Sequence, residues 1–208
     1  MFYAEAVTAL HEGMKRVFDD DYPVEDFRNL PISTDYPSKK VQYPGIWVGF
    51  SPRGSLAIAG IGHREVTQDE DAGTWGQVTR WRFEGEAQFT IVTLSALARA
   101  RLADEVIRVL AFGQLEVGRG AFRSFIQDNP LIAMQLDHDQ ITPSGDAETP
   151  GTPWGTDDIV YEITLSVAAI GEFTSTAQGQ LVPLEEITLI PYRDDEEDPT
   201  TTEGWIGG

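Results

Sequence analysis

The longest alternation of apolar and polar residues in this chain lies between Arg80 and Thr93. Apolar residues take one parity, and charged or polar residues take the other, the period of a strand with one buried and one exposed face. After this run the apolar residues return every three or four positions, as on one stripe of an amphipathic helix: Leu94, Ala98, Leu102, Val106 and Val109. This pattern predicts a strand over residues 77–93 and a helix over residues 95–112, which covers a sheet.

Similar patterns place the elements before this motif. Apolar residues spaced three or four apart predict a first helix over residues 4–18, which ends before the Tyr22-Pro23 pair. Residues 22–44 are rich in proline and predict an extended, mostly irregular segment. Two short strands, Ile46–Phe50 and Ser55–Ile61, then form a hairpin around the turn Ser51–Gly54, and the polar residues 63–76 form a loop or a hairpin tip.

The second half of the chain contains a second clear alternation, from Ile159 to Val167. We expect it to pair antiparallel with the strand over residues 77–93, because both are long and one-sided. The other expected elements are a short helix near 121–127, a strand around 132–136, a loop over 142–158, a final edge strand over 184–191 and a flexible acidic tail over 193–208.

These elements predict an α+β fold: an antiparallel or mixed β-sheet with two main helices packed on one face, plus long loops. We expect residues 1–192 to form a single domain and residues 193–208 to form its tail.

The charge of the chain limits the kinds of molecule that it is expected to bind. There are 34 acidic and 15 basic residues, a net charge of −19, so binding to nucleic-acid phosphates or to an anionic membrane is not expected. No apolar run is long enough to span a membrane, and the first residues lack the basic and apolar regions of a signal peptide. Cysteine is absent, which excludes disulfides and thiol catalysis.

Residues that could carry catalysis are few. The sequence Asp137-His138-Asp139 has metal-ligand residue types, but neighbouring strand residues point to opposite faces, so a polar strand end is the simpler interpretation. Glu84 and Glu86 share a strand face, which is common in so acidic a chain, and no Gly-x-Ser-x-Gly motif is present. We therefore expect no enzyme, no cofactor and no metal site. Trp154 lies in a polar segment, where it is either a docking contact or a local packing residue.

The order of elements resembles the tail terminator proteins of long-tailed phages and related archaeal tailed viruses. The resemblance covers roughly residues 4–175 and rests on the first helix with its proline-rich continuation, on Phe83–Val92 running into Ser95–Asp104, and on Tyr161–Val167 followed by Gly171-Glu172-Phe173. It implies a structural virion protein, assembled in the host cytoplasm, whose homohexameric ring caps the tail tube, stops tube growth and joins the tail to the head connector. DNA would pass through without specific binding.

A ring needs a contact between two different surfaces of the chain. The candidates are Trp47 and Trp75, which are apolar residues in polar segments, Trp154, and the exposed strand face with Arg82, Glu84 and Glu86. The alternatives are another neck or tail-tube protein, a non-viral acidic adaptor module or, with least support, a metal-dependent hydrolase that uses Asp137 and Asp139.

Overall fold

The computed structural model describes residues 2–58, 64–69, 74–112, 120–150 and 158–180. Within these ranges the α-helices are α1 (Phe2–Val17), α2 (Ala96–Phe112) and α3 (Gly120–Gln127), with short 3-10 helices η1 (Glu25–Phe27) and η2 (Lys40–Gln42). The strands are β1 (Ile32–Ser33), β2 (Gly45–Ile58), β3 (Arg64–Asp69), β4 (Thr74–Thr93), β5 (Ile132–Pro150) and β6 (Ile159–Gln180).

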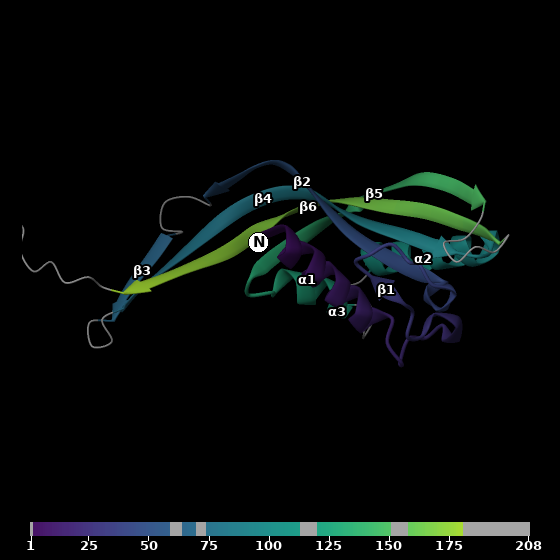
Figure 1. Cartoon of the computed structure of the whole chain (residues 1–208), viewed down its shortest axis with the longest axis horizontal. Helices are drawn as coiled ribbons and strands as arrows, with labels where there is room; N and C mark the ends of the chain where they lie inside the picture. Colours follow the sequence, from purple (N-terminus) through teal and green to yellow (C-terminus); the bar gives the residue numbers. More distant parts are fainter. Residues whose placement is uncertain (1, 59–63, 70–73, 113–119, 151–157, 181–208) are drawn as a thin grey trace, which may run out of the picture.

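The strands form one mixed, six-stranded sheet, and the helices lie on one of its faces (Figure 1). The order is β1-β2-β4-β6-β5, with β3 paired to the beginning of β4. β1 is parallel to β2, and the other neighbouring strands are antiparallel. The α+β fold with a mixed sheet and long loops is therefore confirmed, with α3 as a third, shorter helix beside α1.

The alternation that predicts the long central strand is visible in its burial. Phe83, Ala87, Phe89 and Ile91 of β4 point toward the helices and are at most 2 % exposed. They pack against one apolar stripe of each helix: Leu10 and Met14 on α1, and Leu102, Val106 and Val109 on α2. The 3.6-residue period of each helix and the two-residue period of the strands thus bury one common core.

β4 and β6 are the longest strands and pair along their full common length. Their ladder runs from Thr74↔Gln180 to Thr93↔Tyr161 with no shift in register. The antiparallel pairing of the two long alternating segments is confirmed. Both strands extend well beyond the helices, and this part of the sheet is the long projection in Figure 1.

We call this projection the arm. It consists of residues 54–58 of β2, all of β3, residues 74–82 of β4 and residues 174–180 of β6. A cluster of aromatic rings lies where the arm leaves the body. Phe2 contacts Phe83, Phe50 and Phe173, with ring centroids 4.8, 5.8 and 5.7 Å apart. Beyond this cluster no helix of the described residues covers the sheet (Figure 1).

The hairpin expected around Ser51–Gly54 is wrong. Residues 45–58 form the single strand β2, and both halves pair with β4. The register shifts between Arg53 and Ala57, and Gly54 has a positive φ of 71°. The glycine that indicates a turn therefore lies in a bulge of one long strand, and Pro52 pairs in register with Gly85 just before it.

The loop expected over residues 142–158 is wrong for its first half, because β5 continues to Pro150. This strand also contains a shift in register, between Ser144 and Ala147, next to Gly145 with a φ of 66°. Residues 63–76 contain β3 and the beginning of β4, which is consistent with the hairpin tip predicted as one of two possibilities. The strand expected over residues 184–191 and the tail from residue 193 lie outside the described residues.

Gly171 of β6 is a position where the sheet allows no side chain. A Cβ atom there would overlap the carbonyl oxygen of Ala133 and lie 2.7 Å from the ring of Phe83. We expect Gly171→Ala to lower the free energy of unfolding by about 1–3 kcal/mol, measured by urea denaturation. Gly49→Ala is the matched control, because the nearest atoms to its Cβ, in Gln88, are 3.7 Å away. Equal losses in the two variants would contradict this packing.

Candidate assembly surfaces

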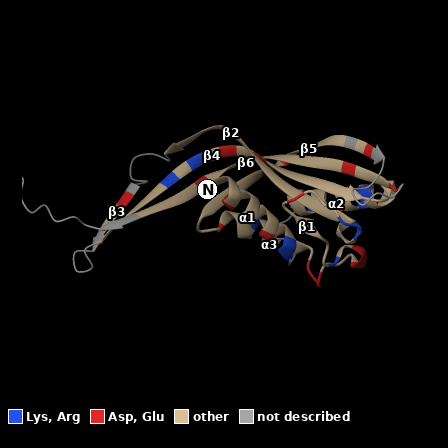
Figure 2. Cartoon of the chain, viewed as in Figure 1, with Lys and Arg blue, Asp and Glu red and all other residues tan. Residues whose placement is uncertain are grey.

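The face of the sheet opposite the α-helices carries no described α-helix or strand, and we call it the open face; at one end the segment around Tyr36 packs onto it. Arg82, Glu84 and Glu86 all lie on this face of β4, as the alternation predicts. Arg82 and Glu84 are exposed and Glu86 is half-buried. On this face of β4 the basic positions come first along the strand and the acidic positions come after them (Figure 2). On this face β4 itself presents charged side chains, so an apolar contact there has to use a neighbouring strand.

Glu86 already has partners within its own chain. The guanidinium of Arg53, on the neighbouring strand, forms an ion pair with its carboxylate. A hydrogen bond from Ser166 is the main cause that holds the pKa of Glu86 below its usual value, and the charge of Arg53 adds to it. A lowered pKa stabilises the fold above the usual carboxyl range, and this contribution is lost as the pH falls through the lowered value. Glu86 therefore helps to hold β2, β4 and β6 together.

Trp47 lies at the other end of the open face and packs against its own chain. Its indole Nε1–H donates a hydrogen bond to the carbonyl of Thr34 at 2.8 Å, and its ring meets Tyr36 edge-on at 5.7 Å. The hydroxyl of Tyr36 in turn bonds to Glu162 of β6, and its own burial, followed by this carboxylate, raises the pKa of Tyr36. These contacts fasten the segment before β2 onto the sheet, so Trp47 has a local packing role.

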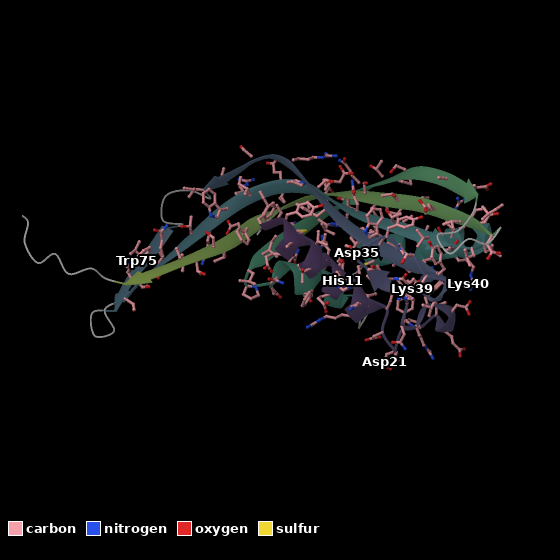
Figure 3. All side chains as sticks on the ribbon, in the orientation of Figure 1. His11, Asp21, Asp35, Lys39, Lys40 and Trp75 are labelled. Carbon is pink, nitrogen blue, oxygen red and sulfur yellow. The ribbon has the colours of Figure 1, made fainter. Side chains whose placement is uncertain are left out.

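Trp75 lies in the arm, near its tip (Figure 3). It shares a face of β4 with Trp81, the same face on which Phe83 points to the core. Direct cross-strand pairs place two more apolar side chains on this face: Ile58 opposite Trp81, and Val66 opposite Gln77. Ile58 is 49 % exposed and Val66 is 56 % exposed. We call the surface of Ile58, Val66, Trp75 and Trp81 the arm underside.

As a surface, the arm underside is missed when the sequence is considered alone, although Trp75 is among the predicted contact residues. Trp81 falls on the apolar parity of β4, but it is only half-buried because the helices end before it. Its indole Nε1–H donates to the hydroxyl of Ser175 at 2.9 Å. The signal that could have indicated an arm is length, since these strands are far longer than the roughly five or six residues of an average strand.

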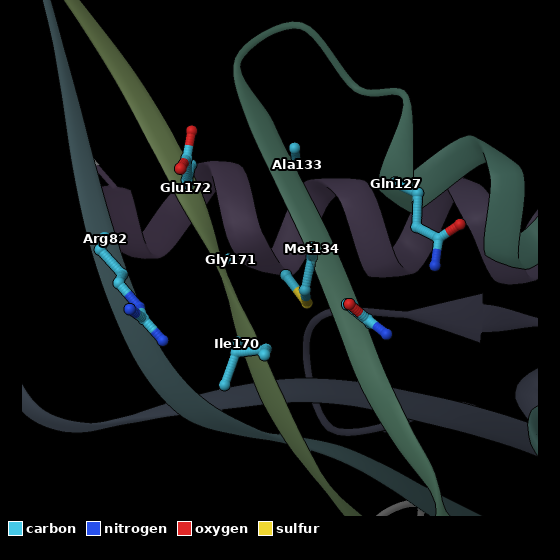
Figure 4. Close-up of a pocket in the computed structure, with 8 residues that line it drawn as sticks. Arg82, Gln127, Ala133, Met134, Ile170, Gly171 and Glu172 are labelled. Carbon is cyan, nitrogen blue, oxygen red and sulfur yellow. The ribbon is translucent and has the colours of Figure 1, made fainter. Parts of the chain in front are cut away.

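A hollow of about 370 Å³ lies around Ile170 of β6 on the open face and reaches Gln127 of α3 at the edge of the sheet formed by β5 (Figure 4). Ile170 is 46 % exposed, and Arg82, Glu172, Gln127 and Gln135 supply polar groups around it. A second hollow of the same size shares Ile170 and Gln135 and continues along β5 toward Asp139. We call the two together the Ile170 hollow. Exposed apolar groups inside a polar rim have the composition of a protein-interaction surface.

In the Asp137-His138-Asp139 sequence, the His138 side chain contacts a cationic side chain from α3. Nη2 of Arg123, on α3, lies 2.6 Å from Nδ1 of His138, and a guanidinium can only donate, so this nitrogen accepts. A guanidinium at that position repels a metal ion. Within the described ranges no three His, Asp or Glu side chains are arranged to hold a metal.

Trp154 lies outside the described residues. Of the other predicted contact residues, the structure brings Arg82, Glu84 and Glu86 together on the open face and places Trp75 on the opposite face, in the arm. None of the helices that the structure describes is long and apolar enough to cross a membrane. No protein-family model and no curated protein sequence matches this chain.

Proposed function

We propose that this chain is a structural virion protein, the tail terminator of a long-tailed phage or a related archaeal tailed virus. In this proposal copies of the chain, six by resemblance, form a ring that caps the tail tube, stops its growth and joins it to the head connector. The ring is assembled in the host cytoplasm and has no catalytic site. Its protein partners are further copies of itself, the tail-tube protein and the connector.

The observation that carries the proposal is the arm. It has an apolar surface that no described residue covers, and residues 51–58 of β2 are all exposed. A sheet of so few strands buries little apolar area unless another element covers it. Large apolar surfaces that remain exposed in one copy of a protein mark contacts with another. An arm that projects from a helix-covered body is suited to reach an adjacent copy.

The charge of the chain also supports a ring around DNA. A net charge of −19 repels phosphates, so DNA could pass a surface of this protein without being held there. The open face carries Glu84 and Glu86, and it is a candidate for the surface that faces the channel or a neighbouring copy.

The experiment measures assembly and its dependence on the arm. Purified full-length protein, studied by light scattering and electron microscopy, is expected to form rings with a mass near six times 23.0 kDa. The double variant Ile58→Asp with Val66→Asp places two charges on the arm underside and is expected to remain monomeric. Both positions are exposed, so its free energy of unfolding should change by no more than about 0.5 kcal/mol per substitution.

Leu97→Asp is the matched control. Leu97 is also a large apolar residue, is 70 % exposed and lies on α2, remote from the arm. This variant should form rings as the unchanged chain does. A chain that stays monomeric at every concentration, or rings that persist in the arm variant, would refute the proposal.

A further inference from the structure

Among the described residues the sheet has two apolar surfaces that nothing covers, and they lie on opposite faces. The arm underside is a continuation of the face that packs against the helices, because Ile58 pairs with Trp81 on the parity of Phe83. The Ile170 hollow lies on the other parity, because Ile170 pairs with Glu84 on the open face. In a single copy these two surfaces therefore cannot meet without a fold in the sheet.

Opposite faces determine what kind of contact can join two copies. If the underside of one copy contacts the open face of the next, the pair still has one free surface of each kind: the open face of the first copy and the underside of the second. Such a contact is head-to-tail, and it produces a ring when the rotation between copies closes. A contact between two identical surfaces would instead stop at a dimer.

The arm can also reach a neighbour. Residues 74–82 of β4, at about 3.4 Å per residue, extend roughly 31 Å beyond the aromatic cluster around Phe2. The underside is apolar at its exposed described positions, Ile58 and Val66, and Trp75 and Trp81 provide rings beside them. The Ile170 hollow offers an apolar floor at Ile170 and Ala168, with charged and amide groups only around it. An apolar side chain entering this hollow would exclude water from both surfaces.

We infer that the arm underside of one copy docks in the Ile170 hollow of the next copy, as two sheets packed face to face. This inference rests on the proposed ring and names the two surfaces that join its subunits. Sheets packed in this way lie about 10 Å apart, which brings the side chains at 58 and 66 against Ile170 of the neighbour. The polar groups of Arg82, Glu172 and Gln135 form the rim of the contact.

The lack of cysteine in this chain permits a direct test by crosslinking of engineered cysteines. A disulfide needs Cα atoms within about 4.4–6.8 Å, which is less than the spacing of two packed sheets, so a short bis-maleimide that joins the two facing sulfur atoms is the suitable reagent. We would make Val66→Cys with Ile170→Cys, and Ile58→Cys with Ile170→Cys to cover a different register. All three positions are between 46 % and 56 % exposed, so the substitutions should leave the fold intact.

With the bis-maleimide, at least one of these double variants is expected to give a ladder of multiples of 23.0 kDa on denaturing electrophoresis, and prior blocking of the thiols with N-ethylmaleimide should abolish it. Val66→Cys with Leu97→Cys is the control and should remain at the single-chain mass. Each single-cysteine variant should also fail to give the ladder, because the inferred contact joins two different positions.

The outcomes separate this inference from the proposed function. If light scattering shows rings but neither double variant that contains Ile170→Cys forms the ladder, the docking of the arm in the hollow is refuted and the ring proposal stands. If the single variant Val66→Cys dimerises fully, the underside meets its own copy and the inference is again refuted. A chain that forms no assembly at all refutes both.

Discussion

Replacing Phe83 with alanine is expected to lower the free energy of unfolding by about 3–5 kcal/mol. Phe83 is 2 % exposed, and its ring centroid lies 4.8 Å from that of Phe2 and 5.9 Å from that of Phe50. The substitution removes both aromatic contacts and leaves a cavity that α1 and the sheet can fill only partly. Urea denaturation followed by circular dichroism would measure the loss from the shift of the midpoint at constant slope.

Trp81→Ala is the comparison for this prediction. Trp81 lies two residues earlier on the same face of β4, but it is only half-buried because it belongs to the arm. Its loss should cost less than about 2 kcal/mol, while it should weaken ring formation. If the two substitutions have equal effects on stability, the boundary between the covered body and the arm is not where the structure places it.

Glu105→Ala is the second substitution with a large expected effect, a loss of about 3 kcal/mol in the free energy of unfolding. Glu105, on α2, is 7 % exposed. Its carboxylate accepts a hydrogen bond of 2.6 Å from the hydroxyl of Tyr22 and forms an ion pair with Arg108 at 3.1 Å. Without the carboxylate, a buried hydroxyl loses a strong acceptor and the guanidinium loses its counter-charge.

Two variants show whether this loss comes from the carboxylate. Glu105→Gln keeps an oxygen that can accept from Tyr22 but removes the charge, so it should cost less than Glu105→Ala. Asp104→Ala removes an exposed carboxylate from the adjacent position of the same helix and should be nearly neutral. The same urea measurement applies, and a Glu105→Ala variant as stable as Asp104→Ala would contradict the role of this pair in joining α2 to the segment after α1.

The long elements are predictable from the sequence because their apolar period persists over many residues. The strand and helix between residues 77 and 112 are confirmed, as are the first helix, the short helix near 121–127 and the antiparallel partner strand that begins at Ile159. In each case one face is buried, and burial of that face is the physical cause of the pattern.

The wrong predictions share one cause. Ser51–Gly54 and the residues around Pro143 and Gly145 have the composition of turns, yet both lie in long strands. Both strands lie at an edge of the described sheet. β5 has no described strand on its outer side, and β2 has only its short pairing with β1 there. A proline costs little on such an edge, and a glycine with positive φ forms a bulge. Turn composition alone cannot distinguish a hairpin turn from a bulge in an edge strand, because the difference depends on which strands pair with the segment in the folded sheet.

The contact surfaces could be predicted only in part. Arg82, Glu84 and Glu86 follow from strand parity, and the structure brings them to one face. The arm underside and the Ile170 hollow depend on where the helices stop covering the sheet, which is a property of the tertiary arrangement. Ile170 in particular looks like an ordinary strand residue in the sequence, and only its exposure distinguishes it.

The uninterrupted ladder between β4 and β6 has a geometric consequence for any assembly built through the arm. From Thr74 to Thr93 the two strands pair with no bulge or register shift that could act as a hinge. The direction of the arm relative to the body is therefore set by the right-handed twist that these strands accumulate. In a closed assembly, this twist would fix the rotation from each copy to the next, and so the number of copies that completes the circle.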